Sequence, residues 1–97
     1  MFIVDLHYIQ ELSAVDHWVA EHRAFLEKYY ASGQFLMSGR KVPRTGGIIL
    51  VRASSLAQVE AIIQEDPFHR EGIARYTITE FIPSMTADTL AMWQEFA

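Results

Sequence analysis

Two residues of the chain, His22 and Asp66, have the types and settings for acid–base chemistry. The segment 14–30 carries apolar residues at helical spacing, and His22 falls within their inward-facing stripe. The apolar residues of this stripe are Val15, Trp18, Val19, Phe25, Leu26 and Tyr29. Asp66 precedes Pro67, which breaks the backbone pattern there. An imidazole on an inner face and a carboxylate fixed by a proline predict a proton-transfer pair, since histidine has an ordinary pKa near neutral pH.

Asp66 also has a structural interpretation. Aspartate is a natural helix N-cap, with Pro67 at the first helical position and Gly72 as a stop. The two roles are compatible, because a capping carboxylate uses one oxygen on backbone N–H groups and can offer the other to an imidazole. In this hypothesis Asp66 orients His22 as a general acid or base. The alternative for His22 is a core histidine whose ring nitrogens bond backbone carbonyls.

Four further residues are candidates for substrate binding. They are Ser38, Gly39, Phe68 and Arg40. The Ser38 hydroxyl and the backbone N–H of Gly39 would bind a substrate oxygen, or Ser38-Gly39 would be small residues at the bend that ends a strand. Phe68 would form an apolar wall of the pocket or pack in the core. Arg40 belongs to a short basic patch within residues 40–44, which would attract an anionic substrate or form a solvated loop.

The composition excludes several function classes. The chain has 97 residues and a net charge of −4 with scattered basic residues, so we expect no nucleic-acid partner. It has no cysteine, which removes disulfides, thiolate metal sites and cysteine nucleophiles. We expect no metal and no cofactor. The first residues show no basic leader, and no segment approaches the ~18 apolar residues of a membrane span, so we expect a cytoplasmic protein without membrane contact.

The hydrophobic patterns predict four strands and two helices in the order β-α-β-β-α-β. The predicted strands are 2–9, 35–39, 48–51 and 74–82, and the predicted helices are 13–31 and 54–66. Ser13 would begin the first helix with Asp16 in a box-like arrangement, and Gly33 would end it. The second helix would bury Leu56, Val59, Ile62 and Ile63. The third strand is uniformly apolar, which predicts burial on both faces.

Right-handed crossovers arrange these elements as an α+β, ferredoxin-like fold, a four-stranded antiparallel sheet with both helices on one face. The second face stays open. Its polar groups would be Asp5, His7, Ser38, Thr77 and Thr79. Apolar side chains must share that face, which predicts a homodimer or higher homo-oligomer with sheets packed face to face or joined at their edges.

The chain divides at Pro83 into a domain, residues 1–83, and a C-terminal helical tail, residues 84–97. Leu90, Trp93 and Phe96 recur in the tail at helical spacing. They predict a short extra helix that docks on the body or on a second subunit.

Several blocks of the sequence resemble the YciI-like (YCII-related) family. The blocks are His22-Arg23-Ala24-Phe25-Leu26, Gly33 followed by Ser38-Gly39, Gly46-Gly47-Ile48-Ile49, and Asp66-Pro67-Phe68 with Gly72-Ile73. The resemblance covers roughly residues 1–83. It implies a ferredoxin-like fold assembled as a dimeric α+β barrel, the scaffold of muconolactone isomerases, cofactor-free monooxygenases and some haem enzymes.

The resemblance also implies a histidine–aspartate pair in an active site, which matches His22 and Asp66. One branch of the family is similar to dehydrochlorinases of chlorinated hydroquinones, while most members have no assigned reaction. The family usually has proline after the Ser-Gly block, and this chain has Arg40. The family's pocket rim and substrate charge therefore do not carry over directly.

The leading functional hypothesis is a small, cofactor-free enzyme, a homodimer, that acts on a compact aromatic or enolisable carbonyl compound. His22 would transfer the proton in a lyase or isomerase reaction, with Asp66 as its orienting partner. The alternative is a non-catalytic metabolite-binding or regulatory module that uses the same pocket. A third interpretation makes both residues structural.

Overall fold

The fold is known from a computed structural model that describes residues 1–96; Ala97, the last residue of the predicted tail, lies outside the described residues. The elements in chain order are β1 (Phe2–Tyr8), α1 (Leu12–Ala31), β2 (Phe35–Arg40), β3 (Gly46–Val51), α2 (Leu56–Ile63), α3 (Pro67–Arg70), β4 (Ala74–Glu80) and the 3-10 helix η1 (Asp88–Trp93). The predicted order is confirmed. The short helix α3 is the capped turn expected at Asp66, with Asp66 as N-cap and Gly72 at a positive φ of 65°.

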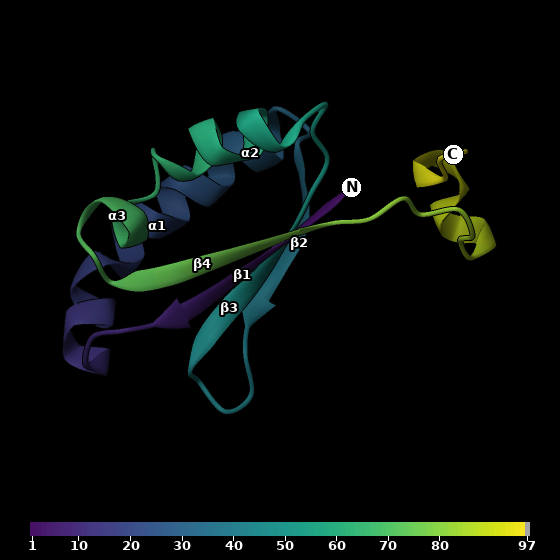
Figure 1. Ribbon diagram of the computed structural model, residues 1–97. Helices are drawn as coiled ribbons and strands as arrows, with labels where there is room; N and C mark the ends of the chain where they lie inside the picture. The colour runs from purple at the N-terminus through teal and green to yellow at the C-terminus, as the bar shows by residue number, and fades with distance from the viewer. Residues whose placement is uncertain (97) are drawn as a thin grey trace.

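The four strands form one antiparallel sheet in the order β2-β3-β1-β4. The α-helices lie together on one face of this sheet, and β4 is the edge strand beside β1 (Figure 1). The ferredoxin-like α+β prediction is confirmed. Alternate residues of β1 face the helices, and Phe2, Val4 and Leu6 are all nearly or fully buried. The core therefore sits between the sheet and the helical layer.

Helix α1 buries Val15, Phe25 and Tyr29 against the sheet. It begins at Leu12 after the N-cap Glu11, which makes no side-chain capping bond. The predicted capping box at Ser13 is therefore wrong, because Ser13 already lies inside the helix. The predicted end is confirmed, since Gly33 follows the C-cap with a φ of 83° that glycine adopts readily.

Helix α2 begins after Ser55, whose side chain accepts a hydrogen bond from the backbone N–H of Gln58 at 3.1 Å. Val59, Ile62 and Ile63 are buried as predicted. Leu56 is 45% exposed, so the prediction that it is buried is wrong. Helical side chains lean toward the helix N-terminus, and a leucine in the first turn therefore reaches past the end of the core.

The helices leave one face of the sheet uncovered, and two predictions fail there. In β3, Ile49 and Val51 are buried but Ile48 is 37% exposed, so this strand is not buried on both faces of the chain. Ser38 lies on the helical side opposite Ile49 and not on the open face. An irregularity between Phe35 and Met37 shifts the register of β2, and alternation alone does not reveal such a bulge.

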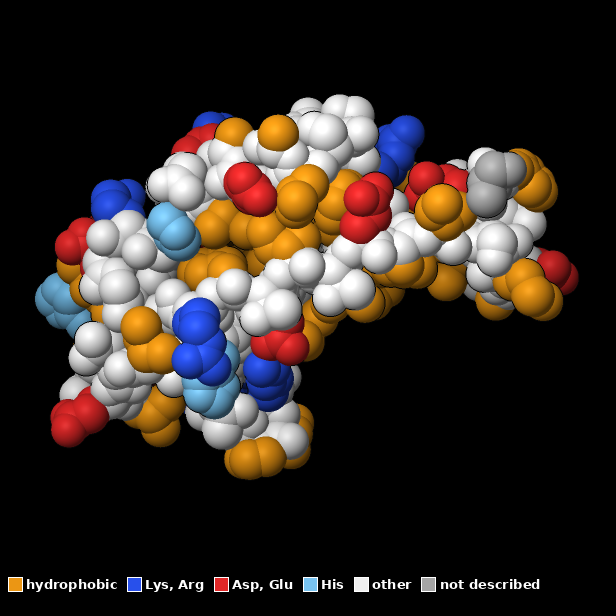
Figure 2. Space-filling model, viewed as in Figure 1, with side chains coloured by type: hydrophobic (Ala, Val, Ile, Leu, Met, Phe, Trp, Pro, Cys, Tyr) orange, Lys and Arg blue, Asp and Glu red, His pale blue; other side chains and the backbone are white. Residues whose placement is uncertain are grey.

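The tail runs beyond the end of β4, away from the helical layer (Figure 1). It contains η1, so the predicted helix is present in the tighter 3-10 form and Phe96 lies beyond it. The tail contacts the body through Trp93, whose ring lies 5.3 Å from the Arg52 guanidinium, and through Glu95, which binds the N-terminal amine of Met1 at 3.3 Å. Figure 2 shows apolar side chains along the tail.

Within residues 1–96, no helix is both long and apolar enough to cross a membrane.

Candidate active site

The structure brings His22 and Asp66 together across 44 residues of sequence. Nδ1 of His22, on α1, lies 2.8 Å from Oδ1 of Asp66, at the start of α3. Asp66 has no exposed surface, and the side chain of His22 is 14% exposed. The predicted contact is therefore present as a hydrogen bond with one fully buried partner.

Both oxygens of Asp66 are engaged. Oδ1 accepts from His22 and from the backbone N–H of Phe68 at 2.9 Å, while Oδ2 accepts from the hydroxyl of Tyr76 at 2.5 Å. The capping role and the imidazole contact thus share one oxygen, which corrects the prediction that each would use a different one. The second oxygen instead binds a tyrosine of β4.

Tyr76 is the site residue that the sequence analysis missed. Burial raises the pKa of Tyr76 above its usual range, and the charge and hydrogen bond of Asp66 add to the shift. Its hydroxyl therefore stays protonated and keeps donating to the carboxylate. The signal available in the sequence is the alternation of β4, which places Tyr76 on the same face as Ile78.

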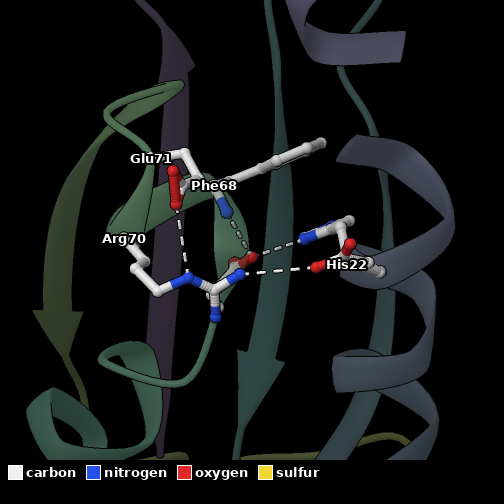
Figure 3. Close-up of polar contacts among 6 residues, drawn as sticks. His22, Phe68, Arg70 and Glu71 are labelled. Atoms are coloured by element: carbon white, nitrogen blue, oxygen red, sulfur yellow. Dashed lines mark hydrogen bonds and ion pairs between the residues drawn. The ribbon is translucent and has the colours of Figure 1, made fainter. Parts of the chain in front are cut away.

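Phe68 forms a flat support for the imidazole. The rings of His22 and Phe68 are stacked, with centroids 4.0 Å apart and planes 5° apart. Figure 3 shows His22 extending from α1 toward α3, which carries Phe68 and Arg70 and is followed by Glu71. Arg70 binds Glu71 and, at 3.4 Å, Glu21, so an ion pair joins α3 to the residue next to His22.

A second contact fixes the segment before Asp66. The ammonium of Lys28 donates to Glu65 at 2.5 Å, and the hydroxyl of Tyr29 donates to the same carboxylate. The hydrogen bond from Lys28 holds the pKa of Glu65 below its usual range. Helix α1 therefore contacts this segment through Lys28 and Tyr29 at Glu65 and through His22 at Asp66.

The second nitrogen of His22, Nε2, makes no hydrogen bond within residues 1–96. No buried side-chain nitrogen or oxygen in that part of the chain lacks a partner, so Nε2 is reached by solvent. His22 borders a cavity of about 510 Å³ between α1 and the sheet. The cavity is lined by Leu6, Tyr8, Val19, His22, Arg23, Leu26, Ser38, Gly39, Arg40, Arg44, Gly47, Ile48, Ile49 and Phe68. His22 thus has one ring nitrogen on a buried carboxylate and the other accessible to solvent, and the residue lines the cavity.

The four predicted substrate-binding residues, Ser38, Gly39, Arg40 and Phe68, all line this cavity. The register shift in β2 is what turns Ser38 toward it. The Ser38 hydroxyl lies 2.5 Å from the hydroxyl of Tyr30, which fixes the position of its oxygen. The substrate-binding roles of these four residues stay predictions. Among residues 1–96 no group of three or more His, Asp or Glu side chains is placed to hold a metal ion.

Residues 1–82 match the family model described as the YCII-related domain. The chain belongs to the YCII-related family. No curated protein matches the sequence. Among solved structures, it is similar to the 5-chloro-2-hydroxyhydroquinone dehydrochlorinase TftG from Burkholderia phenoliruptrix AC1100, in complex with 2,5-dihydroxybenzoquinone. The match has a TM-score of 0.70 and 19% identity, covering 84% of this chain and 93% of that chain, and it shows a shared fold.

The YCII-related domain spans every strand of the sheet and every residue that lines the cavity. Helix η1 begins at Asp88, beyond the matched range. The His22–Asp66 pair therefore lies within the range that matches the family model, and η1 lies outside it.

Proposed function

We propose that this YCII-related protein is a small-molecule enzyme, a cofactor-free lyase or isomerase, in which His22 transfers the proton. One observation carries the proposal. The imidazole is held by a buried carboxylate at Nδ1, its Nε2 is accessible to solvent, and His22 lines a cavity of about 510 Å³. A general acid or base needs a fixed ring with one nitrogen within reach of the substrate.

Asp66 would determine which nitrogen of the neutral His22 ring carries the proton. When Nδ1–H donates to Oδ1 of Asp66, the neutral ring presents the lone pair of Nε2 to the cavity. Nε2 would take a proton from a substrate carbon, leaving the electron pair in a new double bond or enolate. The buried carboxylate then stabilises the imidazolium. The ring would return the proton to another carbon in an isomerisation, or to the leaving group in an elimination.

The cavity suits a compact organic ring. Phe68 and Ile49 provide apolar surface, and Ser38 supplies a hydroxyl for a substrate oxygen. A fold-sharing protein, TftG, is a dehydrochlorinase of a chlorinated hydroquinone, solved with a dihydroxybenzoquinone. That chemistry supports an aromatic or quinone-like substrate for the cavity of this chain.

The proposal includes a cytoplasmic homodimer built on the open face of the sheet. Met37 is 56% exposed and Ile48 is 37% exposed on this face, and Leu50 is half-buried between them. An apolar sheet face without a covering layer is typical of an interface between subunits.

The test is proton exchange in D2O with a panel of small phenols, quinones and enolisable ketones, followed by mass spectrometry and NMR. The wild-type protein should introduce deuterium into a substrate carbon or release a leaving group, and His22→Gln should abolish the reaction. His17→Gln is the matched control, because His17 is an exposed histidine on the same helix. Saturable binding without exchange or turnover would favour a non-catalytic binding module.

A further inference from the structure

The permanently charged side chains that line the cavity are all basic. Three arginines line it, Arg23, Arg40 and Arg44, and no aspartate or glutamate is among the lining residues. Arg44 is compensated, because its guanidinium donates to Asp16 at 2.5 Å. Arg23 and Arg40 form no ion pair with a carboxylate within residues 1–96. The cavity therefore carries positive charge that the described part of the chain does not neutralise.

The two uncompensated arginines come from different walls of the cavity. Arg23 follows His22 on α1, so its guanidinium and the imidazole share one wall. Arg40 ends β2 and pairs with Gly47 of β3, which has no side chain to fill the space beside it. A molecule in the cavity therefore has a cation available on the helical wall and another on the sheet wall.

The remaining lining is largely apolar. Its aliphatic and phenylalanine side chains are Leu6, Val19, Leu26, Ile48, Ile49 and Phe68. A ligand that complements both the apolar lining and the two arginines has a compact apolar body and one anionic group. The planar fork of a guanidinium pairs with a carboxylate through two parallel hydrogen bonds.

A phosphate would favour a different setting, since phosphate sites commonly use free N–H groups at a helix N-terminus. The first turn of α1 does not line the cavity, and the N-terminus of α3 is already capped by Asp66. The chemistry of the lining therefore fits a carboxylate better than a phosphate.

We propose that Arg23 and Arg40 form an anion subsite, so that the ligand of this cavity is a small aromatic or aliphatic carboxylate. The inference deepens the proposed function, because it assigns the substrate class of the same cavity. The carboxylate binds at the guanidinium groups, and the apolar body of the ligand lies against Phe68 beside Nε2 of His22.

The test uses benzoate, its uncharged analogue benzamide, and phenyl phosphate as probes, with binding followed by calorimetry and by chemical-shift changes of the full chain. Benzoate should bind the wild-type protein at least about tenfold more tightly than benzamide, since bonds between charged groups are stronger than neutral ones. The shifts should centre on Phe68 and Leu26. The double variant Arg23→Gln with Arg40→Gln should remove this preference.

The matched control is the double variant Arg52→Gln with Arg75→Gln, which makes the same change of charge at exposed positions outside the cavity. It should bind benzoate as the wild type does. Equal binding of benzoate and benzamide, or equal loss in the two double variants, would overturn the inference. Tighter binding of phenyl phosphate than of benzoate would overturn the assignment to carboxylates.

His22→Gln separates this inference from the proposed function. If benzoate still binds to His22→Gln but the wild type shows no proton exchange or turnover with any phenol, quinone, ketone or carboxylate, the anion subsite stands and the catalytic proposal fails. If neutral phenols or ketones are turned over by the wild type and by the Arg23→Gln, Arg40→Gln variant alike, the catalytic proposal stands and the anion subsite fails.

Discussion

The hydroxyl of Tyr76 lies 2.5 Å from Oδ2 of Asp66. Because Oδ1 of the same carboxylate binds His22, the last strand of the sheet and the first helix meet at one buried side chain. Asp66 thereby has little freedom to rotate. The orientation of the imidazole depends on β4 as well as on α1 and α3.

Removing the Tyr76 hydroxyl should loosen this arrangement. In Tyr76→Phe, the buried Oδ2 of Asp66 loses its one side-chain partner within residues 1–96, and such a loss costs about 1–3 kcal/mol of unfolding free energy. Urea unfolding of the variant and the wild type measures the difference. Tyr30→Phe is the control, since the Tyr30 hydroxyl is exposed and should change stability by less than ~0.5 kcal/mol. A Tyr76→Phe protein as stable as the wild type would contradict the account.

The raised pKa of Tyr76 predicts loss of stability at alkaline pH. Below about pH 10, tyrosine is protonated in both states and the raised pKa has no effect. Above it the unfolded chain loses the proton while folded Tyr76 keeps it, so the unfolding free energy falls by up to roughly 1.4 kcal/mol per pH unit for this residue.

Urea unfolding between pH 9 and 11 tests this dependence. Tyr76→Phe should make the fall of the unfolding free energy with pH less steep, by an amount that corresponds to at most one proton. A smaller slope should remain, because burial also raises the pKa of Tyr29. An unchanged slope in Tyr76→Phe would show that another group controls the alkaline transition.

Gly46 should not tolerate a side chain. A Cβ there would lie 1.8 Å from the carbonyl oxygen of Leu6, so Gly46→Ala must separate β3 from β1. We expect a loss of at least about 3 kcal/mol of unfolding free energy, or failure to fold. Gly39→Ala is the control, because no atom lies within 4 Å of its added Cβ. Thermal unfolding followed by circular dichroism compares the two, and equal melting temperatures would refute the close approach.

A charge on the open face of the sheet should separate the proposed dimer. Met37→Lys adds an ammonium at an exposed apolar position on that face, and the monomer should stay folded. Light scattering after size-exclusion chromatography gives the mass of each species. Leu56→Lys makes the same kind of change on the helical side and should remain dimeric. A wild-type protein that is monomeric at all concentrations would remove the proposed interface.

Much of the fold could be predicted from the sequence because the signals are local. The alternation of β1 and the Asp-Pro block each follow from neighbouring residues, and both appear in the structure. The bulge in β2 and the exposure of Ile48 could not be predicted, because they depend on how strands pair and on which face the helices cover.

The candidate site, too, could be predicted only in part from the sequence. The sequence placed His22 inward and Asp66 at a helix start, and the structure joins them. Tyr76 was missed because its contact with Asp66 depends on the exact position of β4 beside α3. Its pattern in the sequence is that of an ordinary half-buried strand residue.

The most direct test of the paired imidazole is nitrogen NMR of the His22 ring, assigned by comparison with His22→Gln. We predict that the neutral form of the ring carries its proton on Nδ1, bound to Asp66, and has a lone pair on Nε2 whose signal shifts when a ligand enters the cavity. Asp66→Asn should change that tautomer. A neutral ring protonated on Nε2, or a ring whose signals are the same in Asp66→Asn, would contradict the central claim.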